Sequence, residues 1–211
     1  SAEVRRFILD DIAWWLRHYG ADGLRLDAVH ALVDHSDRHI LQDAAALAAN
    51  LSADLGRPLA LVAESDLNDP RLVTPAELGG YGLAAQWNDD VHHAIHTIVS
   101  GERQGYYADF GSPECLATVL TEGFFHAGTY SSFRGRTHGE RIDPARVAPS
   151  RLLAYTCTHD QVGNRARGDR PAAYLTDGQL AVKAALVLFS AFTPMLFMGE
   201  EWGARTPFRF F

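Results

Sequence analysis

The sequence contains few cysteines, which limits the kind of scaffold it can form. Only Cys115 and Cys157 occur among the 211 residues, and they form no CxxC pair. A framework of disulfides is therefore not expected. A reducing compartment is the default for such a chain, so we expect a cytoplasmic protein.

Basic clusters and long apolar runs are also missing. The formal net charge is −7 and no run of Lys and Arg occurs, which argues against nucleic acid and an anionic membrane surface as partners. The longest apolar stretch, residues 181–198, is interrupted by Lys183, Ser190, Thr193 and Pro194, so no transmembrane helix is expected. The N-terminus shows no charged segment followed by an apolar one, as a signal peptide would.

The sequence does contain a regular alternation of strand and helix patterns. Apolar residues make up 47% of the chain, enough for a large core. Their spacing predicts helices over residues 1–19, 38–55, 91–100, 114–122 and 177–191, and strands over 23–27, 59–64, 83–87, 152–157 and 194–198. This alternation predicts βα units and an α/β fold with a parallel sheet. We find no repeat, linker or domain boundary, and interpret residues 101–150 as a helix plus an elaborate loop.

Acidic side chains follow the predicted strands, each at the point where its strand ends. They are Asp27, Glu64, Asp89, Asp160 and Glu200. In a (β/α)8 barrel all strand ends of this kind meet on one face, where the active site lies. Any one of these acids alone could be a loop residue or a helix N-cap. As a set, after apolar runs, they predict an active site on a partial (β/α)8 barrel.

Three of these carboxylates suit the cleavage of a glycosidic bond. Retaining glycosidases use one carboxylate as nucleophile and a second as general acid/base. Arg25 lies two residues before Asp27, on the same face of a strand, and keeps Asp27 ionised as a nucleophile requires. Glu64 follows an apolar run and has no cation near it in sequence, which makes it the candidate for the protonated acid.

The residues around these acids resemble three blocks of the alpha-amylase superfamily, glycoside hydrolase family 13. The blocks are Gly23–His30, Val62–Glu64 and Thr158–Asp160, in that order along the chain. The resemblance implies that Asp27 is the nucleophile, Glu64 the general acid/base and Asp160 the stabiliser of the transition state. It also implies that Arg25 and His159 help to orient the nucleophile and the sugar.

Longer stretches are similar to the members of this superfamily that act on malto-oligosyltrehalose. These stretches are Ala63–Pro70, Gln86–His93, His159–Ala166, Phe197–Gly203 and Pro207–Phe211. The similarity implies retaining hydrolysis of the α-1,4 bond next to the trehalose end, with release of trehalose and without a metal or organic cofactor. The implied substrate-binding residues, besides Arg25 and His159, are Leu26, Ala28, Val29, His30, Asn88, Asp89, Asp90, Val91, His92, Gln161, Val162, Gly163 and Asn164.

The sequence departs from the family pattern in two respects. Thr158 stands where an Asn is expected, and the first catalytic block of the superfamily is absent. The five predicted strands resemble the fourth to eighth of a barrel, so residues 1–211 are predicted to be the C-terminal part of a catalytic barrel domain without a complete second domain. The remainder of the barrel is then a required partner. Because part of a barrel has open sheet edges, we expect the isolated segment to be poorly stable and inactive.

Three alternative functions remain open. A glycogen-branching enzyme would share the three acids, although the stretch Asp89–His93 favours the trehalose-releasing members. A metal-dependent barrel hydrolase could use His92 and His96, which share a helix face, but no third ligand at metal spacing and no HExxH motif follows. A non-catalytic glucan-binding scaffold is expected to lack one of the three acids, and all three are present.

Overall fold

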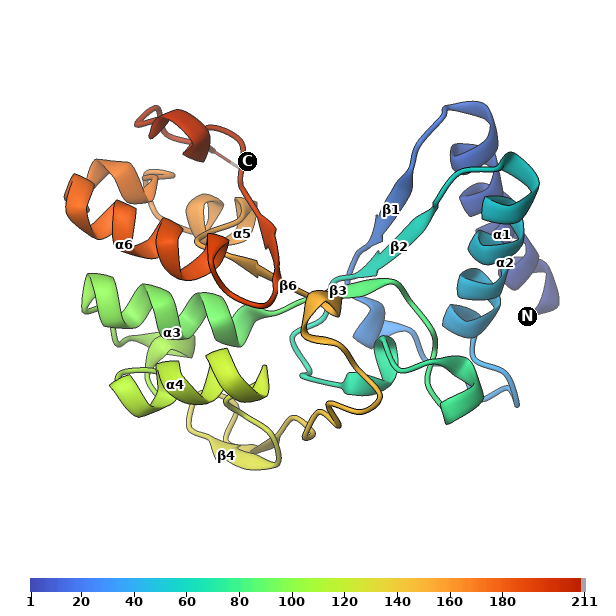
Figure 1. Cartoon of the computed structure of the whole chain (residues 1–211), viewed down its shortest axis with the longest axis horizontal. Coiled ribbons are helices and arrows are strands. Elements are labelled where there is room, and N and C mark those ends of the chain that lie inside the picture. Colours follow the sequence, from blue (N-terminus) through green and yellow to red (C-terminus); the bar gives the residue numbers. More distant parts are fainter. Residues whose placement is uncertain (210–211) are drawn as a thin grey trace. The chain divides into compact units, whose positions relative to one another are not determined.

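The computed structural model describes residues 1–209, so Phe210 and Phe211 of the Pro207–Phe211 stretch lie outside the described residues. The chain forms two compact units (Figure 1). Unit 1 contains residues 1–87 and 142–151, and unit 2 contains residues 88–141 and the chain from residue 152 onward. The sequence shows no boundary at residue 87, because unit 1 is completed by the distant segment 142–151.

Unit 1 consists of two helices packed on parallel strands. Its elements are α1 (Ala2–His18), β1 (Gly23–Leu26), α2 (Ile40–Leu55), β2 (Ala60–Ala63) and β3 (Ala85–Trp87). β2 pairs in parallel with both β1 and β3, with Leu26 opposite Ala63 and Ala63 opposite Gln86. Gly23 is required where β1 begins, because a Cβ at this position would lie 2.4 Å from the carbonyl oxygen of Ala60. The predicted helices and strands of this unit are confirmed, with shorter strands.

The core of unit 1 lies between the two helices and the strands. It is built from apolar side chains at helical spacing, such as Ile12 and Leu16 on α1 and Leu41, Ala44, Ala48 and Leu51 on α2, together with Leu61 and Ala63 on β2. α2 begins at a capping box formed by His39 and Gln42, and it ends at Gly56 in the left-handed conformation. Burial of these apolar side chains stabilises unit 1, at about 25 cal/mol per Å² of apolar surface removed from water.

Unit 2 contains helices, a parallel strand pair and a hairpin. Its elements are α3 (Asp89–Ser100), α4 (Pro113–Glu122), β4 (Thr129–Ser131), β5 (Arg136–His138), β6 (Leu152–Tyr155), α5 (His159–Gly163), α6 (Asp177–Leu188) and β7 (Thr193–Met195). β6 and β7 pair in parallel, with Tyr155 opposite Met195. α3 packs against both α4 and α6 (Figure 1), and its buried Ile95 lies in the core of this unit.

The structure adds two elements that the sequence pattern does not predict. β4 and β5 form an antiparallel hairpin inside the segment interpreted as a loop, and α5 is a helix of five residues. Three-residue strands and a helix of little more than one turn are too short for a periodic pattern. The α/β class with parallel strands is confirmed, and neither unit closes a barrel within residues 1–209.

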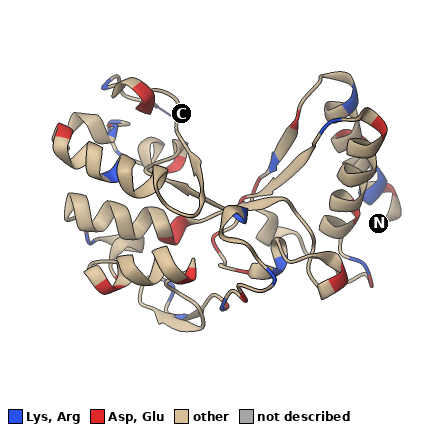
Figure 2. Cartoon of the chain, in the orientation of Figure 1, with Lys and Arg blue, Asp and Glu red and all other residues tan. Residues whose placement is uncertain are grey.

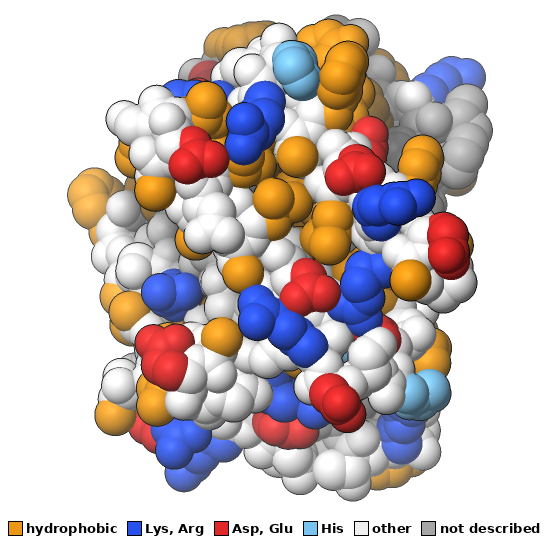
Figure 3. Space-filling model, turned by 90° about the vertical axis from the view of Figure 1, so that its right-hand side faces the viewer, with side chains coloured by type: hydrophobic (Ala, Val, Ile, Leu, Met, Phe, Trp, Pro, Cys, Tyr) orange, Lys and Arg blue, Asp and Glu red, His pale blue; other side chains and the backbone are white. Residues whose placement is uncertain are grey.

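The surface is mixed in charge. Lys, Arg, Asp and Glu are distributed over both units (Figure 2). On the face shown in Figure 3, acidic and basic side chains are interspersed, with hydrophobic side chains between them. Within residues 1–209 the helices are all too short or too polar to cross a membrane.

Candidate active site

Two of the three predicted catalytic acids lie at the ends of neighbouring strands in unit 1. Asp27 follows β1 and Glu64 follows β2, and the residues before them, Leu26 and Ala63, are partners in the sheet register. The ladder continues past the strand ends, because the Glu64 N–H donates to the Leu26 carbonyl at 2.9 Å and the Val29 N–H donates to the Glu64 carbonyl at 3.1 Å. The backbone therefore places the two acids side by side.

Arg25 contacts both acids. Its Nη2 lies 2.8 Å from Oδ1 of Asp27 and 3.8 Å from Oε2 of Glu64. The predicted pairing of Arg25 with Asp27 is therefore confirmed. Glu64 has no cation near it in sequence, but the pairing of β1 with β2 brings Arg25, which is distant in sequence, close to it in space. The guanidinium also lies 4.2 Å above the ring centre of Trp87 and covers one face of that ring.

A strained turn at Ala28 supplies a further contact to Glu64. Ala28 adopts φ 45° and ψ 45°, in the left-handed region that costs a residue with a Cβ roughly 1–2 kcal/mol. In this conformation its N–H donates to Oε2 of Glu64 at 2.6 Å. The strain is thus stored at the point where the chain turns toward the acid, as is common at functional sites.

The two acids differ in their exposure to solvent. The side chain of Asp27 is 75% exposed, whereas that of Glu64 is 19% exposed. Two carboxylates in unlike environments can take different roles, one as a charged nucleophile and one as a proton donor. The geometry of unit 1 is therefore compatible with the pair of roles predicted from sequence.

The third predicted acid, Asp160, lies in unit 2 on the first turn of α5. Thr158 caps this helix: its hydroxyl accepts from the Asp160 N–H at 3.2 Å, and its own N–H donates to Oε1 of Gln161 at 2.7 Å. His159 lies beside Asp160, with Nε2 3.5 Å from Oδ1, and the Asp160 side chain is 46% exposed. The departure from the family at Thr158 therefore preserves a capping residue, since Thr is a good N-cap.

The structure thus assembles the predicted residues in two groups. Arg25, Asp27 and Glu64 lie together in unit 1, and His159 and Asp160 lie together in unit 2. That the three acids surround one sugar remains a prediction.

Several residues assigned to substrate binding by the resemblance are enclosed by protein. Asn88 caps α3 and donates to the Gly123 carbonyl at 2.7 Å, and the Asp90 carboxylate accepts from two backbone N–H groups, those of Phe125 and His126, at 2.8 and 2.9 Å. Asn88, Asp90, Val91, His92 and Val162 are all buried. Their contacts organise unit 2, and their direct contact with substrate remains a prediction.

The other predicted contact residues are more accessible. Asp89 is half-buried and accepts a hydrogen bond from the Tyr155 hydroxyl. His30 is exposed, with its Nδ1 3.8 Å from Oδ1 of Asp66, while its neighbour Val29 is buried. Among the remaining residues, Leu26, Ala28, Gln161 and Gly163 are half-buried and Asn164 is exposed.

The two histidines considered as a metal pair are already bonded to protein groups. His92 contacts the Thr156 carbonyl at 2.8 Å and the Tyr107 hydroxyl at 2.9 Å, and His96 contacts Glu102 and Lys183. Burial lowers the pKa of His92 well below its ordinary value and that of His96 to about 4, so both rings are neutral at pH 7. In residues 1–209 no group of three or more His, Cys, Asp and Glu is placed to hold a metal ion.

Two features of the site lack a signal that sequence reasoning could have used. The N–H of Ala28 points at Glu64 because Ala28 is left-handed, and Ala has no intrinsic preference for that conformation. Lys183 contacts His96 across 87 positions of sequence. Only its place in an apolar stretch, as an interruption, marks it in the sequence.

Comparisons with known proteins give one consistent result. No protein-family model matches the chain. A malto-oligosyltrehalose trehalohydrolase of Mycobacterium tuberculosis is 65% identical over all 211 residues, and one of Saccharolobus solfataricus is 44% identical over the same length. The chain spans 36% of the length of each of these relatives.

Solved structures show the same relationship at the level of the fold. A crystal structure of a Salmonella typhimurium protein assigned as an alpha amylase matches with a TM-score of 0.87 and 37% identity, covering all of this chain and 36% of that one. An Anoxybacillus alpha-amylase matches with a TM-score of 0.63 at 19% identity, covering 98% of this chain and 38% of that one, which shows the fold alone.

The fold and the strand-end acids define the class: this chain resembles part of the catalytic domain of the alpha-amylase superfamily. Within that class, the proteins that it resembles along its whole length are the malto-oligosyltrehalose trehalohydrolases. The resemblance predicted from sequence, including that of a partial chain, is confirmed.

Proposed function

We propose that the protein containing this chain is a retaining glycoside hydrolase that cleaves the α-1,4 bond next to the trehalose end of malto-oligosyltrehalose. The observation that supports this best is the group in unit 1, where one guanidinium contacts two acids at the ends of adjacent parallel strands. A pair of carboxylates in unlike surroundings is the minimum that retaining cleavage requires. The names of the relatives suggest the substrate.

In the first step, Asp27 and Glu64 act on opposite sides of the scissile bond. The Asp27 carboxylate attacks the anomeric carbon while Glu64 gives its proton to the glycosidic oxygen, so the C–O bond breaks and trehalose leaves. The malto-oligosaccharide is then held as an ester on Asp27. Arg25 orients the attacking carboxylate, and the Ala28 N–H holds Oε2 of Glu64, which leaves the other oxygen to carry the proton.

In the second step, water hydrolyses the glycosyl ester on Asp27. Glu64, now ionised, takes a proton from water, and the oxygen attacks the anomeric carbon, which releases the malto-oligosaccharide and restores Asp27. Both steps develop positive charge on the sugar ring. We assign to the Asp160 carboxylate the stabilisation of that charge.

Products distinguish this function from others in the superfamily. The whole protein is incubated with maltotriosyltrehalose and, separately, with maltopentaose, which contains the same number of glucose units. We expect trehalose and α-configured maltotriose from the first substrate and much slower cleavage of the second. Equal cleavage of both, or no free trehalose, would refute the proposed specificity.

The alternatives predict different outcomes in the same assay. A 1,4-alpha-glucan branching enzyme of Marinobacter nauticus is 30% identical over 113 residues, and a branching activity would produce α-1,6 linkages and no trehalose. A metal-dependent hydrolase would lose activity after EDTA treatment. A non-catalytic scaffold would bind the glucan and leave it intact.

A cytoplasmic location belongs to the same proposal. Cys115 and Cys157 are both buried and free, which suits a reducing compartment. Burial raises the pKa of each thiol to about 12, so neither is a reactive thiolate at neutral pH.

A further inference from the structure

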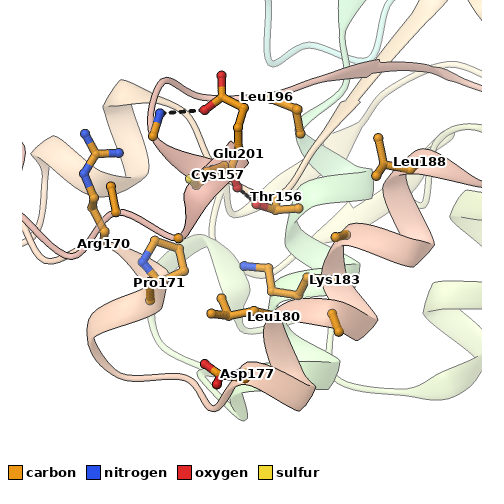
Figure 4. Close-up of a pocket in the computed structure, with 17 residues that line it drawn as sticks. Thr156, Cys157, Arg170, Pro171, Asp177, Leu180, Lys183, Leu188, Leu196 and Glu201 are labelled. Carbon is orange, nitrogen blue, oxygen red and sulfur yellow. Dashed lines mark hydrogen bonds between the residues drawn. The ribbon is translucent and has the colours of Figure 1, made fainter.

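Unit 2 contains a buried lysine that the proposed mechanism does not use. Lys183, on α6, is the one lysine in the sequence and is 1% exposed. It lies on the wall of a cavity of about 520 Å³ whose lining is largely apolar, with Leu180 and Leu188 on the same helix (Figure 4). A buried ammonium is costly in such surroundings unless it is hydrogen-bonded.

Lys183 begins a chain of hydrogen bonds with a defined direction. Its Nζ lies 3.0 Å from Nδ1 of His96. Since an ammonium group can only donate, Nδ1 accepts, and the ring proton is on Nε2. Nε2 then donates to Oε2 of Glu102 at 2.8 Å. Glu102 also accepts from Arg165, at 2.9 Å on Oε1 and 3.3 Å on Oε2.

The charges along this chain suit the contacts. Burial lowers the pKa of Lys183 to about 8 and, together with Lys183, that of His96 to about 4. At neutral pH the lysine is therefore mainly charged and the imidazole neutral. Burial opposes the charge on Glu102, but the hydrogen bonds from Arg165 and His96 outweigh it and lower its pKa. The sequence of groups is cation, neutral ring, anion and cation.

Two further groups lie near Lys183 from other segments of unit 2. Cys157, after β6, and Glu200, after β7, both line the same cavity, and the Glu200 carboxylate favours the charged form of Lys183 electrostatically. The carboxylate of Glu200 is held in place, since it accepts from the Phe197 N–H at 2.7 Å and from the Thr156 hydroxyl.

The chain of hydrogen bonds ends next to the helix that carries Asp160. Arg165 follows α5 by two residues, and its N–H donates to the Val162 carbonyl of that helix at 3.2 Å. Its guanidinium also lies 4.3 Å above the ring centre of Tyr174. On the other side of α5, the Thr156 carbonyl contacts Nδ1 of His92 at 2.8 Å. The segment bearing Asp160 is thus contacted by His92 before α5, and by Glu102, which His96 contacts in turn, after α5.

We propose that Lys183 is a positioning residue for Asp160, acting through His96, Glu102 and Arg165. It fixes which nitrogen of His96 bears the proton, and this directs the ring to Glu102. Glu102 then holds Arg165 in a two-point contact that places the end of α5. The inference rests on the proposed role of Asp160 in catalysis.

A purely structural role of Lys183 and a positioning role lead to different expectations for the variant Lys183→Met. If Lys183 only filled space, an unbranched apolar side chain would fill it without the cost of burying a charge. Lys183→Met would then retain full activity. If Lys183 positions Asp160, the same variant keeps the fold and loses turnover, because a small displacement of a reacting group can cost up to ~100-fold in rate.

The test measures kcat, KM and thermal unfolding of Lys183→Met in the whole protein with maltotriosyltrehalose. We expect kcat to fall roughly 10- to 100-fold with KM changed less than about 3-fold, and the unfolding midpoint to be retained. The matched control is Val182→Met, the same new side chain at a half-exposed position of α6, with kcat unchanged. Imidazole ¹⁵N NMR should show that Nδ1 of His96 loses its hydrogen bond in Lys183→Met and keeps it in the parent protein and in Val182→Met.

A second variant keeps the test decisive if Lys183→Met does not fold. Glu102→Gln preserves shape and removes the charge that holds Arg165, and it should lower kcat in the same way. In the double variant the two losses in kcat should not add, because both changes interrupt the same series of hydrogen bonds. Unchanged kcat in Glu102→Gln, or in a folded Lys183→Met, overturns the proposal.

Asp160→Asn in the same assay separates this proposal from the proposed function. It should lower kcat with a smaller effect on KM. If Asp160→Asn is fully active, the assigned role of Asp160 fails and the positioning proposal fails with it. If Asp160→Asn is impaired while Lys183→Met and Glu102→Gln are normal, only the positioning proposal fails.

Discussion

Acidification is expected to destabilise the packing around α3, through His96. The pKa of this imidazole is lowered from 6.5 to about 4 by burial and by the neighbouring Lys183. The unfolded chain therefore binds a proton at pH values where the folded chain does not. The contribution of the neutral His96 ring to the free energy of unfolding is fully present above about pH 6.5 and is lost as the pH falls toward 4.

The size of this effect follows from the two pKa values. For a single group with pKa 6.5 in the unfolded state and about 4 in the folded state, lowering the pH from 7 to 5 costs about 2 kcal/mol. The His96 side chain is 3% exposed, so little of this is lost to solvent screening. His92 acts in the same direction, because its pKa is also lowered by burial.

Native-state hydrogen exchange of the α3 amides, corrected for the intrinsic rate, measures the opening free energy of this helix directly. It should fall by at least about 2 kcal/mol between pH 7 and pH 5. His96→Gln can still accept from Lys183 and donate to Glu102 but does not titrate, so its pH dependence should be about 2 kcal/mol smaller. His35→Gln, at an exposed position, is the control for removal of an imidazole. Equal pH dependence in the parent and His96→Gln would refute the reasoning.

Three further predictions concern the group in unit 1. Asp27→Asn should reduce turnover by roughly 10³-fold or more, because a carboxamide cannot form the glycosyl ester; near-normal kcat would remove the nucleophile assignment. Glu64→Gln should slow the natural substrate far more than an aryl glycoside with a good leaving group, and equal slowing would count against an acid role. Ala28→Val should lower the unfolding free energy by about 1–2 kcal/mol and Ala28→Gly should not, since a β-branched residue resists the left-handed conformation; equal stability in urea titrations would contradict the strain.

The helices and the strand-end acids could be predicted because their signals are local. α2 and α6 are marked by apolar residues at helical spacing, and each is found within a few residues of its predicted bounds. Asp27 and Glu64 directly follow apolar runs, so their place at the ends of strands follows from the order of residues. Arg25 lies on β1 and Asp27 follows that strand two residues later, so their pairing needs no other element.

Contacts between distant parts of the chain were decided by the tertiary structure. Arg25 reaches Glu64 because β1 pairs with β2, and Ala28 turns toward Glu64 because the adjacent strand offers an acceptor for its N–H. The Asp90 carboxylate accepts hydrogen bonds from the N–H groups of residues 125 and 126, and His92 bonds to the carbonyl of residue 156; these contacts place the two side chains inside unit 2. A periodic pattern reports only which face of an element is apolar, so it contains no information about which partner that face meets. The candidate acids could therefore be predicted from the sequence, whereas the groups that hold and orient them depended on how the elements pack.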